Sequence, residues 1–266
     1  MLWVATSDGI FKSTNGGDSW ENKQSGSFRD LKVKPSNPNI IYASTNSQFY
    51  RSTNGGNSFN LVTTGLPSAA GRMYIDVTQA NSNYVYLVAA TGGYDYEGVY
   101  RSTNSGLSFT QMANTTDIFN GVSQAWYDLA FAVDPNDEKI LFVGGVNCWR
   151  STDDGQNWSL NTHWTGSGGA DYMHADEHML KYNPLNDYIY SGNDGGLYVS
   201  TNNGGNWTDI SDGLQISQFY SLGVSQTVQD KVITGAQDNG TFLKDATNWD
   251  AVIGGDGMEC IIDYTN

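Results

Sequence analysis

Short apolar segments alternate with polar, glycine-rich turns along the chain. Some segments alternate apolar and polar positions, as in LKVKP at 31–35, LAFAVDP at 129–135 and LKYNP at 180–184. Others are nearly continuous, as in IIYAS at 40–44 and ILFVGG at 140–145. Short runs of this kind between turn residues are typical of strands joined by hairpins. The pattern therefore predicts an all-β fold.

A polar motif closed by an aromatic residue recurs five times. Its copies read STNGGDSW, STNGGNSF, STNSGLSF, STDDGQNW and STNNGGNW, and successive copies begin 39, 50, 49 and 49 residues apart. A repeat of about 40–50 residues indicates one supersecondary unit per repeat. Each repeat holds four strand-like segments, so it predicts one four-stranded blade of a β-propeller.

The chemistry of the motif, here called the box, suits a tight turn. Ser and Asn or Asp side chains bond neighbouring backbone amides, and Gly permits a positive φ. We therefore expect each box to be structural and to fasten the third strand of a blade to the fourth; the alternative is a ligand-binding loop in every blade. The box positions are Ser13, Asn15, Gly17, Trp20, Ser52, Asn54, Gly56, Phe59, Ser102, Asn104, Gly106, Phe109, Ser151, Asp153, Gly155, Trp158, Ser200, Asn202, Gly204 and Trp207.

Six blades are predicted within a single domain, 1–266. Residues 221–249 form a sixth repeat without a clean box. The N-terminal repeat lacks its first strand, and the C-terminal segment MECIIDY looks like a lone first strand, so joining them would close a ring without open sheet edges. The alternative is that the sequence is cut from a larger propeller. The predicted blades are 258–266 with 1–24, then 28–63, 72–113, 125–162, 177–211 and 218–250.

Charge narrows the choice of partners. The chain has 13 basic and 28 acidic residues, a net charge of −15 and a pI of about 4.3. Binding to nucleic acid requires basic patches that displace counterions, so a nucleic-acid partner is not expected. An anionic membrane surface is not expected as a partner for the same reason, and no apolar run is long enough for membrane insertion. Two cysteines, Cys148 and Cys260, make no disulfide framework and are expected to be buried.

The boxes carry a resemblance to a known family. The pattern S-x-[DN]-x-G-x-x-[WF] resembles the Asp-box, or BNR repeat, of β-propellers. The segment HADEHMLKYNPLNDYIYSGNDGGLYVSTNNGG, 174–205, resembles secreted bacterial glycosyl-hydrolase-like Asp-box proteins, and sortilin-type receptors share the repeat. The resemblance implies a propeller and an extracellular or cell-surface location, as part of a larger secreted protein. It implies no single activity, because this fold hosts unrelated functions.

Individual relatives of the Asp-box family differ from this chain. Sialidases hold the substrate carboxylate with three arginines, one of them in an Arg-Ile-Pro motif, which this sequence lacks. Xyloglucanase-type enzymes use two aspartates between two propellers, so a single propeller would hold half of such a site. Photosystem assembly factors share the boxes, but this acidic chain offers no arginine-rich docking face.

The binding site is expected where the first strands of the blades begin. In a propeller these strands line the central channel, and the loops before them converge at one mouth, which is where function is usually carried. Exposed aromatic rings there would stack on sugar rings or, alternatively, pack between blades. The candidate ligand-binding residues are Trp126, Tyr127, Arg72, Tyr172 and Tyr220.

Carboxyl groups at the mouth are candidates for catalysis. Glycoside hydrolysis needs two carboxyls, of which one has a raised pKa, roughly 5–9 Å apart. The candidates are Asp128, Asp176, Glu177, Asp256 and Glu259. His174, Asp176 and His178 would share one face of an extended segment and could bind a divalent metal; alternatively, the histidines bond neighbouring loops.

The sequence thus favours an extracellular recognition module that binds a glycan or a protein at the channel mouth. One alternative is a glycoside hydrolase with paired mouth carboxylates that acts on a polysaccharide. Another is a structural scaffold in a larger secreted protein that binds nothing. A divalent metal is the one cofactor that the residues suggest.

Overall fold

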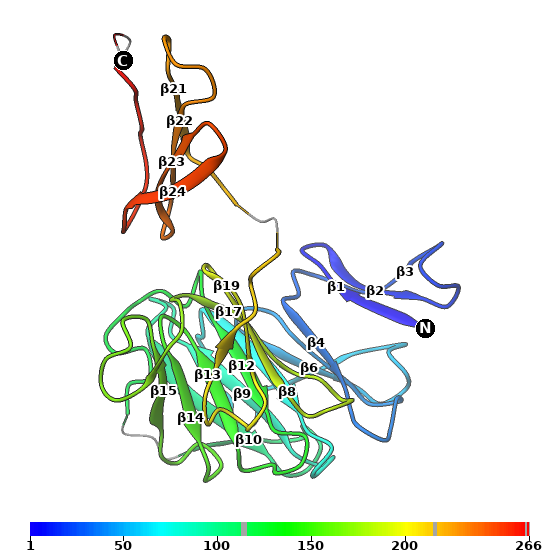
Figure 1. The fold of residues 1–266 in the computed structure, drawn as a ribbon. Helices are drawn as coiled ribbons and strands as arrows, with labels where there is room; N and C mark the ends of the chain where they lie inside the picture. The colour runs from blue at the N-terminus through cyan, green and yellow to red at the C-terminus, as the bar shows by residue number, and fades with distance from the viewer. Residues whose placement is uncertain (113–115, 215–216, 264, 266) are drawn as a thin grey trace. The chain divides into compact units, whose positions relative to one another are not determined.

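The computed structural model describes residues 1–112, 116–214, 217–263 and 265, and these residues form strands but no helix (Figure 1). Accordingly, no helix that could cross a membrane is found among them. The strands are β1 Leu2–Ala5, β2 Gly9–Ser13, β3 Glu21–Ser25, β4 Asp30–Val33, β5 Ile41–Ser44, β6 Phe49–Ser52, β7 Asn60–Val62, β8 Arg72–Val77, β9 Val85–Ala90, β10 Tyr96–Ser102, β11 Thr110–Gln111, β12 Ala130–Val133, β13 Leu141–Gly144, β14 Cys148–Ser151, β15 Ser159–His163, β16 Asp171–Tyr172, β17 Glu177–Tyr182, β18 Ile189–Asn193, β19 Gly196–Ser200, β20 Thr208–Asp209, β21 Ser221–Val224, β22 Val232–Ala236, β23 Gly240–Asp245 and β24 Asn248–Ile253.

The strands form six sheets in chain order, which confirms the predicted all-β propeller class. Four sheets have four strands each: β4–β7, β8–β11, β17–β20 and β21–β24. The first sheet, β1–β3, has three strands, which agrees with the missing first strand in the sequence. The sheet of β12–β15 gains β16, which pairs parallel to β15 through Thr162 with Asp171 and His163 with Tyr172.

The chain divides into two compact units. The first comprises residues 1–193 and 197–209, and the second comprises 194–196 and 210–266. The predicted single domain and the predicted blade boundaries remain predictions. Within the predicted blades, residues 113, 264 and 266 lie outside the described residues.

Packing in the first unit follows from burial on both faces of the second strands. All residues of β5, β9 and β13 are buried, which explains their continuous apolar sequence. The first strands of successive sheets contact one another in the order β4, β8, β12 and β17. Both cysteines are buried and free, as the sequence predicted.

Each box builds its turn from side-chain hydrogen bonds. In the first box, the Ser13 hydroxyl donates to Asn15 Oδ1 and accepts from the Gly17 amide, while Asn15 Oδ1 accepts from the Ser19 amide. The same three bonds recur in the other four boxes. The box is therefore a local turn, as its residue types suggest.

The boxes also contact the preceding sheet, which the sequence did not reveal. A Cβ on Gly56 would lie 2.0 Å from the Trp3 ring, and one on Gly204 would lie 2.6 Å from the Phe142 ring. Trp3 and Phe142 each come from the second strand of the preceding repeat, β1 and β13. Glycine is thus favoured here for two reasons: it leaves room for a ring from the neighbouring sheet, and it tolerates a positive φ.

Arginines directly before the boxes also connect neighbouring sheets. Arg51 Nε donates to Ser105 O at 2.7 Å, and Arg101 Nη1 pairs with Asp154 Oδ2 at 2.9 Å. Both partners lie in the following box. These arginines therefore join successive repeats.

In the second unit, the C-terminal segment crosses the sheet β21–β24 closely. The Gly257 amide donates to Ala236 O at 2.9 Å, and the Cys260 amide donates to Ser221 Oγ at 3.3 Å. Residues 258–263 form no strand there. The closing role predicted for residues 258–266, as first strand of the N-terminal blade, remains a prediction.

Candidate functional site

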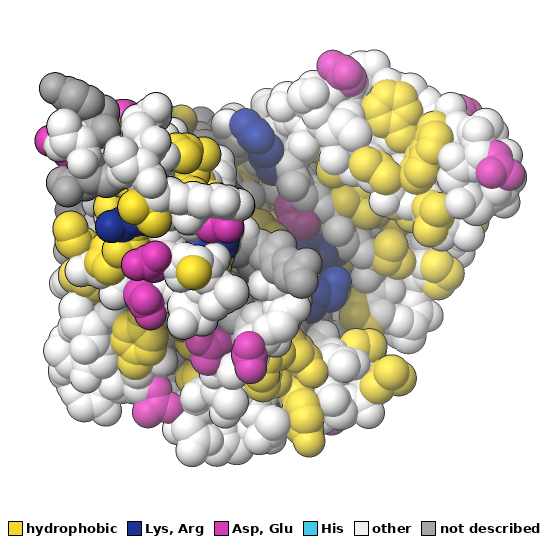
Figure 2. All heavy atoms as spheres, turned by 45° about the horizontal axis from the view of Figure 1, so that its top comes forward, with side chains coloured by type: hydrophobic (Ala, Val, Ile, Leu, Met, Phe, Trp, Pro, Cys, Tyr) yellow, Lys and Arg dark blue, Asp and Glu magenta, His cyan; other side chains and the backbone are white. Residues whose placement is uncertain are grey.

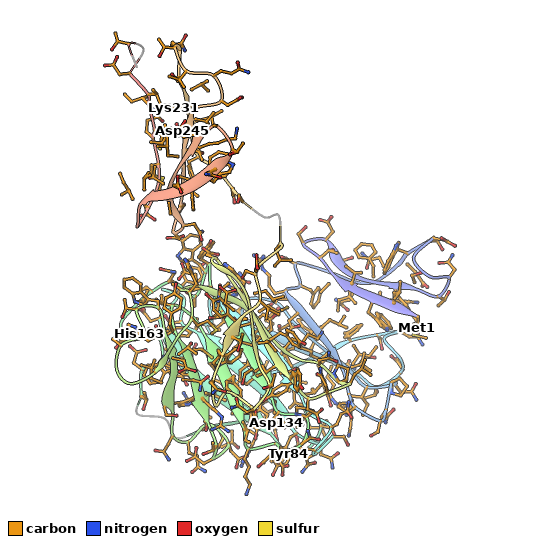
Figure 3. The ribbon with its side chains drawn as sticks, viewed as in Figure 1. Met1, Tyr84, Asp134, His163, Lys231 and Asp245 are labelled. Atoms are coloured by element: carbon orange, nitrogen blue, oxygen red, sulfur yellow. The ribbon has the colours of Figure 1, made fainter. Side chains whose placement is uncertain are left out.

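The candidate site lies in the first unit, at the end where first strands begin, here called the mouth end. The boxes and the loops between first and second strands occupy the other end, here called the box end. Figure 3 shows this polarity: His163, which ends β15, lies at the opposite end from Asp134 and Tyr84, which belong to the loop between first and second strands. Antiparallel meanders place these two kinds of loop at opposite ends.

Three carboxyl groups meet at the mouth end, where β17 begins beside the loop before β12. The Asp128 and Asp176 side chains lie close together, because the amide of Gln124 bonds both of them. Gln124 Nε2 donates to Asp176 Oδ1 at 2.9 Å and to Asp128 Oδ2 at 3.3 Å. Glu177 follows Asp176 in the chain, and its amide donates to Gly145 O at 2.9 Å. These three acids are here called the carboxyl cluster.

Burial and mutual repulsion favour protonated acids in the carboxyl cluster. Asp128 and Glu177 are 2% and 1% exposed, whereas Asp176 is half-buried. Burial raises the pKa of Asp128, and the charge of Asp176 raises it further. Burial also raises the pKa of Glu177, to about 8, although hydrogen bonds from Ser191 and Asn193 oppose the shift. At neutral pH the cluster therefore retains protons and can donate as well as accept hydrogen bonds.

An exposed aromatic pair lies next to the carboxyl cluster. Trp126 is 62% exposed, and its ring lies 5.5 Å from that of Tyr127. The other side of Tyr127 meets the His178 ring edge-on at 4.8 Å. The aromatic pair and the acids come from the same two segments, 124–128 and 176–178.

Arg72 fixes the backbone beneath the aromatic pair. Its Nη1 donates to Ala125 O at 2.7 Å and to Tyr127 O at 3.2 Å. Burial lowers the pKa of Arg72, and nearby Arg29 lowers it further. These bonds hold residues 125–127 in place, and ligand binding by Arg72 remains a prediction.

The other predicted site residues are distributed as follows. Tyr172 is exposed in β16 of the first unit. Tyr220, Asp256 and Glu259 belong to the second unit, where Tyr220 Oη donates to Gln237 Oε1 and Asp256 Oδ1 accepts from the Asp238 amide. Only Asp128, Asp176, Glu177, Trp126, Tyr127, Arg72 and His178 are brought together by the contacts described above.

The geometry expected for a metal site differs from the observed one. The three side chains were expected to share one face of an extended segment, but φ of Asp176 is 68°, so the segment is not extended there. His174 Nδ1 lies 3.2 Å from Ala175 O, and His178 packs on Tyr127. Metal binding by His174, Asp176 and His178 remains a prediction, and Asp176 is the part-exposed carboxylate in this group that could contact a cation.

Several residues of the site were not predicted from the sequence. Gln124 bridges two acids, and Ser191 and Asn193 hold Glu177, but all three are ordinary polar residues in sequence. Gly144 was detectable as part of the GG pair that ends β13: a Cβ there would lie 2.4 Å from Glu177 Cβ. A small pocket beside Asp128 is lined by Phe119, Val122, Gln124, Ala125, Asp128, Gly145 and Val146.

Comparisons with known proteins identify the class as β-propeller. The structure resembles a GH74 enzyme of Niastella koreensis (TM-score 0.59, 18% identity) and a GH74 xyloglucanase of Xanthomonas campestris (TM-score 0.58, 14% identity). Each match covers 94% of this chain and 43% of the other. The extracellular domain of a one-component system protein of B. thetaiotaomicron gives TM-score 0.55 at 14% identity, over 96% of this chain and 34% of that one.

These likenesses establish the fold alone, because all identities are low. The chain spans less than half the length of each of these structures. The sequence matches no family model and no curated protein. The chain is therefore an all-β propeller protein whose function must be argued from its own site.

Proposed function

We propose that this chain is an extracellular recognition module that binds a glycan at the mouth end of its first unit. The observation that carries the proposal is the exposed Trp126–Tyr127 pair, fixed from below by Arg72 and placed beside the carboxyl cluster. Sugar rings offer apolar faces that stack on aromatic rings and hydroxyls that need convergent donors and acceptors. The site supplies both within two short segments.

The carboxyl geometry favours binding over hydrolysis. Retaining and inverting glycosidases hold their two carboxyls about 5 Å or more apart, on opposite sides of the scissile bond. Asp128 and Asp176 are both bonded by Gln124 Nε2, so these two carboxyls lie side by side. Glu177 is buried, with Ser191 and Asn193 on its oxygens. These acids are better suited to hydrogen-bonding a ligand than to cleaving it.

An extracellular location and membership of a larger secreted protein belong to the same proposal. Extracellular domains occur among proteins of similar fold, and the acidic, polar surface is compatible with that setting. Figure 2 shows the mixture of hydrophobic and polar side chains on the face that it presents. The alternative is a protein ligand at the same surface, and the experiment must distinguish it from a glycan.

The test is a glycan-array screen with the full chain, with and without a chelator, and with reducing-sugar release measured for every hit. We expect binding without sugar release, and loss of binding in Trp126→Ala and Tyr127→Ala. Leu107→Ala is the control, because Leu107 is an equally exposed apolar side chain that lies in the third box.

Each other outcome has a defined meaning. Sugar release that stops in Asp128→Asn or Asp176→Asn while binding persists would establish hydrolysis instead. Loss of binding with chelator would support the metal prediction for His174, Asp176 and His178. No binding to any glycan would overturn the proposal and leave a protein ligand or a scaffold.

A further inference from the structure

The type of sugar that fits the mouth end can be argued from its charges. The mouth end of the first unit carries the exposed acids Asp95, Asp117 and Asp171 and the half-buried Asp176. Asp128 and Glu177 are buried there and have raised pKa values, so they add little negative charge at neutral pH. The arginines in this region are Arg29 and Arg72. Lys12, Lys34, Arg51 and Arg101 form their bonds at the box end instead. Lys32 of β4 is paired with Asp30 and Asp76. The mouth end is thus predominantly acidic.

Both arginines at the mouth end are engaged by the protein itself. Arg72 Nη1 is bonded to two backbone carbonyls, and Arg29 Nε donates to Asn46 Oδ1 at 3.0 Å. Proteins recognise the carboxylate or sulfate of an acidic sugar through guanidinium groups that offer paired donors to it. Arg72 is held by two backbone carbonyls and is poorly placed for that task. The exposed acids at this end would repel an anionic ligand.

The same surface suits a cation. The faces of Trp and Tyr rings attract ammonium groups, and Trp126 and Tyr127 lie beside the carboxyl cluster. The half-buried carboxylate of Asp176 is the accessible acid of this cluster, since Asp128 and Glu177 are buried. An ammonium group over the rings could contact it while the sugar ring stacks.

We propose that the glycan recognised by the Trp126–Tyr127 pair carries free, protonated amino groups, as in oligomers of glucosamine. This inference rests on the proposed glycan-binding function and specifies its ligand. The aromatic pair would supply stacking, and Asp176 would supply the charge that distinguishes an amino sugar from its neutral or acidic counterpart.

The experiment compares three ligands of equal length by titration calorimetry: a glucosamine oligomer, its fully N-acetylated form and a uronic acid oligomer. The N-acetylated form keeps the sugar backbone but removes the charge. We expect the amino form to bind at least about tenfold more tightly than the N-acetylated form, which corresponds to about 1.4 kcal/mol. Its affinity should fall as salt is raised, and the uronic acid oligomer should not bind.

Two variants locate the effect. Asp176→Asn keeps the shape of the side chain and should remove most of the preference for the amino form. Asp137→Asn, at the box end, should leave the preference unchanged. Far-ultraviolet circular dichroism and a melting curve check that both variants are folded.

The outcomes separate this inference from the proposed function. Equal or tighter binding of the N-acetylated or uronic acid oligomer would overturn the inference and leave glycan recognition standing. A preference that survives in Asp176→Asn would overturn the role of Asp176. If none of the oligomers and no glycan on the array binds while a lysine-rich peptide does, both proposals are wrong and the ligand is a basic protein segment.

Discussion

At the scale of single residues, the glycine at the fifth position of a box has two separate reasons to be glycine. One is its positive φ, which is 74° at Gly56 and 79° at Gly204. The other is contact with a ring from the preceding sheet, Trp3 or Phe142. The sequence motif reveals the first reason, whereas the second depends on how neighbouring sheets pack.

Replacing Gly56 by Ala should therefore lower the unfolding free energy by more than the cost of placing Ala at a positive φ. The new Cβ would lie 2.0 Å from the Trp3 ring, so the ring must move. Overpacking typically costs about 1–3 kcal/mol, in addition to the cost of a positive φ. Gly16→Ala is the matched control, since Gly16 has φ of 79° but no neighbouring atom within 4 Å. Urea unfolding measures the loss of unfolding free energy in both variants. Equal losses in Gly56→Ala and Gly16→Ala would show that the Trp3 contact contributes nothing.

The buried acids of the carboxyl cluster should make stability fall as pH rises. Burial raises the pKa of Asp128 and raises that of Glu177 to about 8 in the folded state. Unfolding returns both to ordinary values near about 4, so between about pH 4 and 8 the unfolded state binds fewer protons. The free energy of unfolding should decrease across this window because of these two groups and level off above it.

Amide variants test this pH dependence. Glu177→Gln and Asp128→Asn remove the titration, so each should flatten the dependence of unfolding free energy on pH between about 4 and 8. Asp137→Asn, in the exposed loop at the box end, is the control. If a variant shows the same dependence of unfolding free energy on pH as the wild type, the acid replaced in that variant is not protonated in the folded state.

At the scale of elements, the C-terminal segment lies against β21 and β22 because both strands carry a glycine beneath it. A Cβ on Gly235 would lie 2.5 Å from the Gly257 carbonyl carbon, and one on Gly223 would lie 2.9 Å from Cys260 O. Glycines inside strands often mark such close backbone approaches. The contact involves main-chain atoms, which cannot move aside as a flexible side chain can.

Gly235→Ala should displace the segment 257–260 from the second unit. The Gly257 amide would lose its bond to Ala236 O, so it should exchange with solvent faster. Hydrogen exchange of a peptide that covers residues 256–262 measures this effect. Gly254→Ala is the control, because no atom lies within 4 Å of its added Cβ and its φ is not in the left-handed region. Unchanged exchange in Gly235→Ala would show that the segment does not need the glycine.

At the scale of the whole molecule, the first sheet has an open edge at β1. The sheet β1–β3 has three strands, and Leu2 and Val4 of β1 are exposed. Unpaired strand edges attract further strands, and propellers remove them by closing a ring. The sequence predicts that residues 258–266 supply the missing strand.

Removal of residues 258–266 tests ring closure. If this segment pairs with β1, the β1 amides that do not bond β2 should exchange slowly in the full chain and rapidly after the deletion. The melting temperature should fall as well. If exchange in β1 is the same in both chains, the C-terminal segment does not complete the first blade.

What the sequence determined by itself is what depends on neighbours along the chain. The alternating and continuous apolar runs specified strands, because burial on one face or both dictates those patterns. The five boxes specified turns, because Ser13 and Asn15 bond amides within four residues of themselves. The repeat spacing then indicated blades, and six sheets are observed.

The sequence indicated which residues gather at the mouth, but only the tertiary structure decided how they contact one another. Gln124 contacts Asp176, 52 positions away in the chain, and Arg72 contacts Ala125, 53 positions away, so no local pattern encodes either bond. Burial raises the pKa of Asp128 and of Glu177, and nothing in the sequence distinguishes these two acids from exposed ones. A pKa or a binding surface depends on all the atoms around a group, and those atoms come from distant segments that only folding brings together.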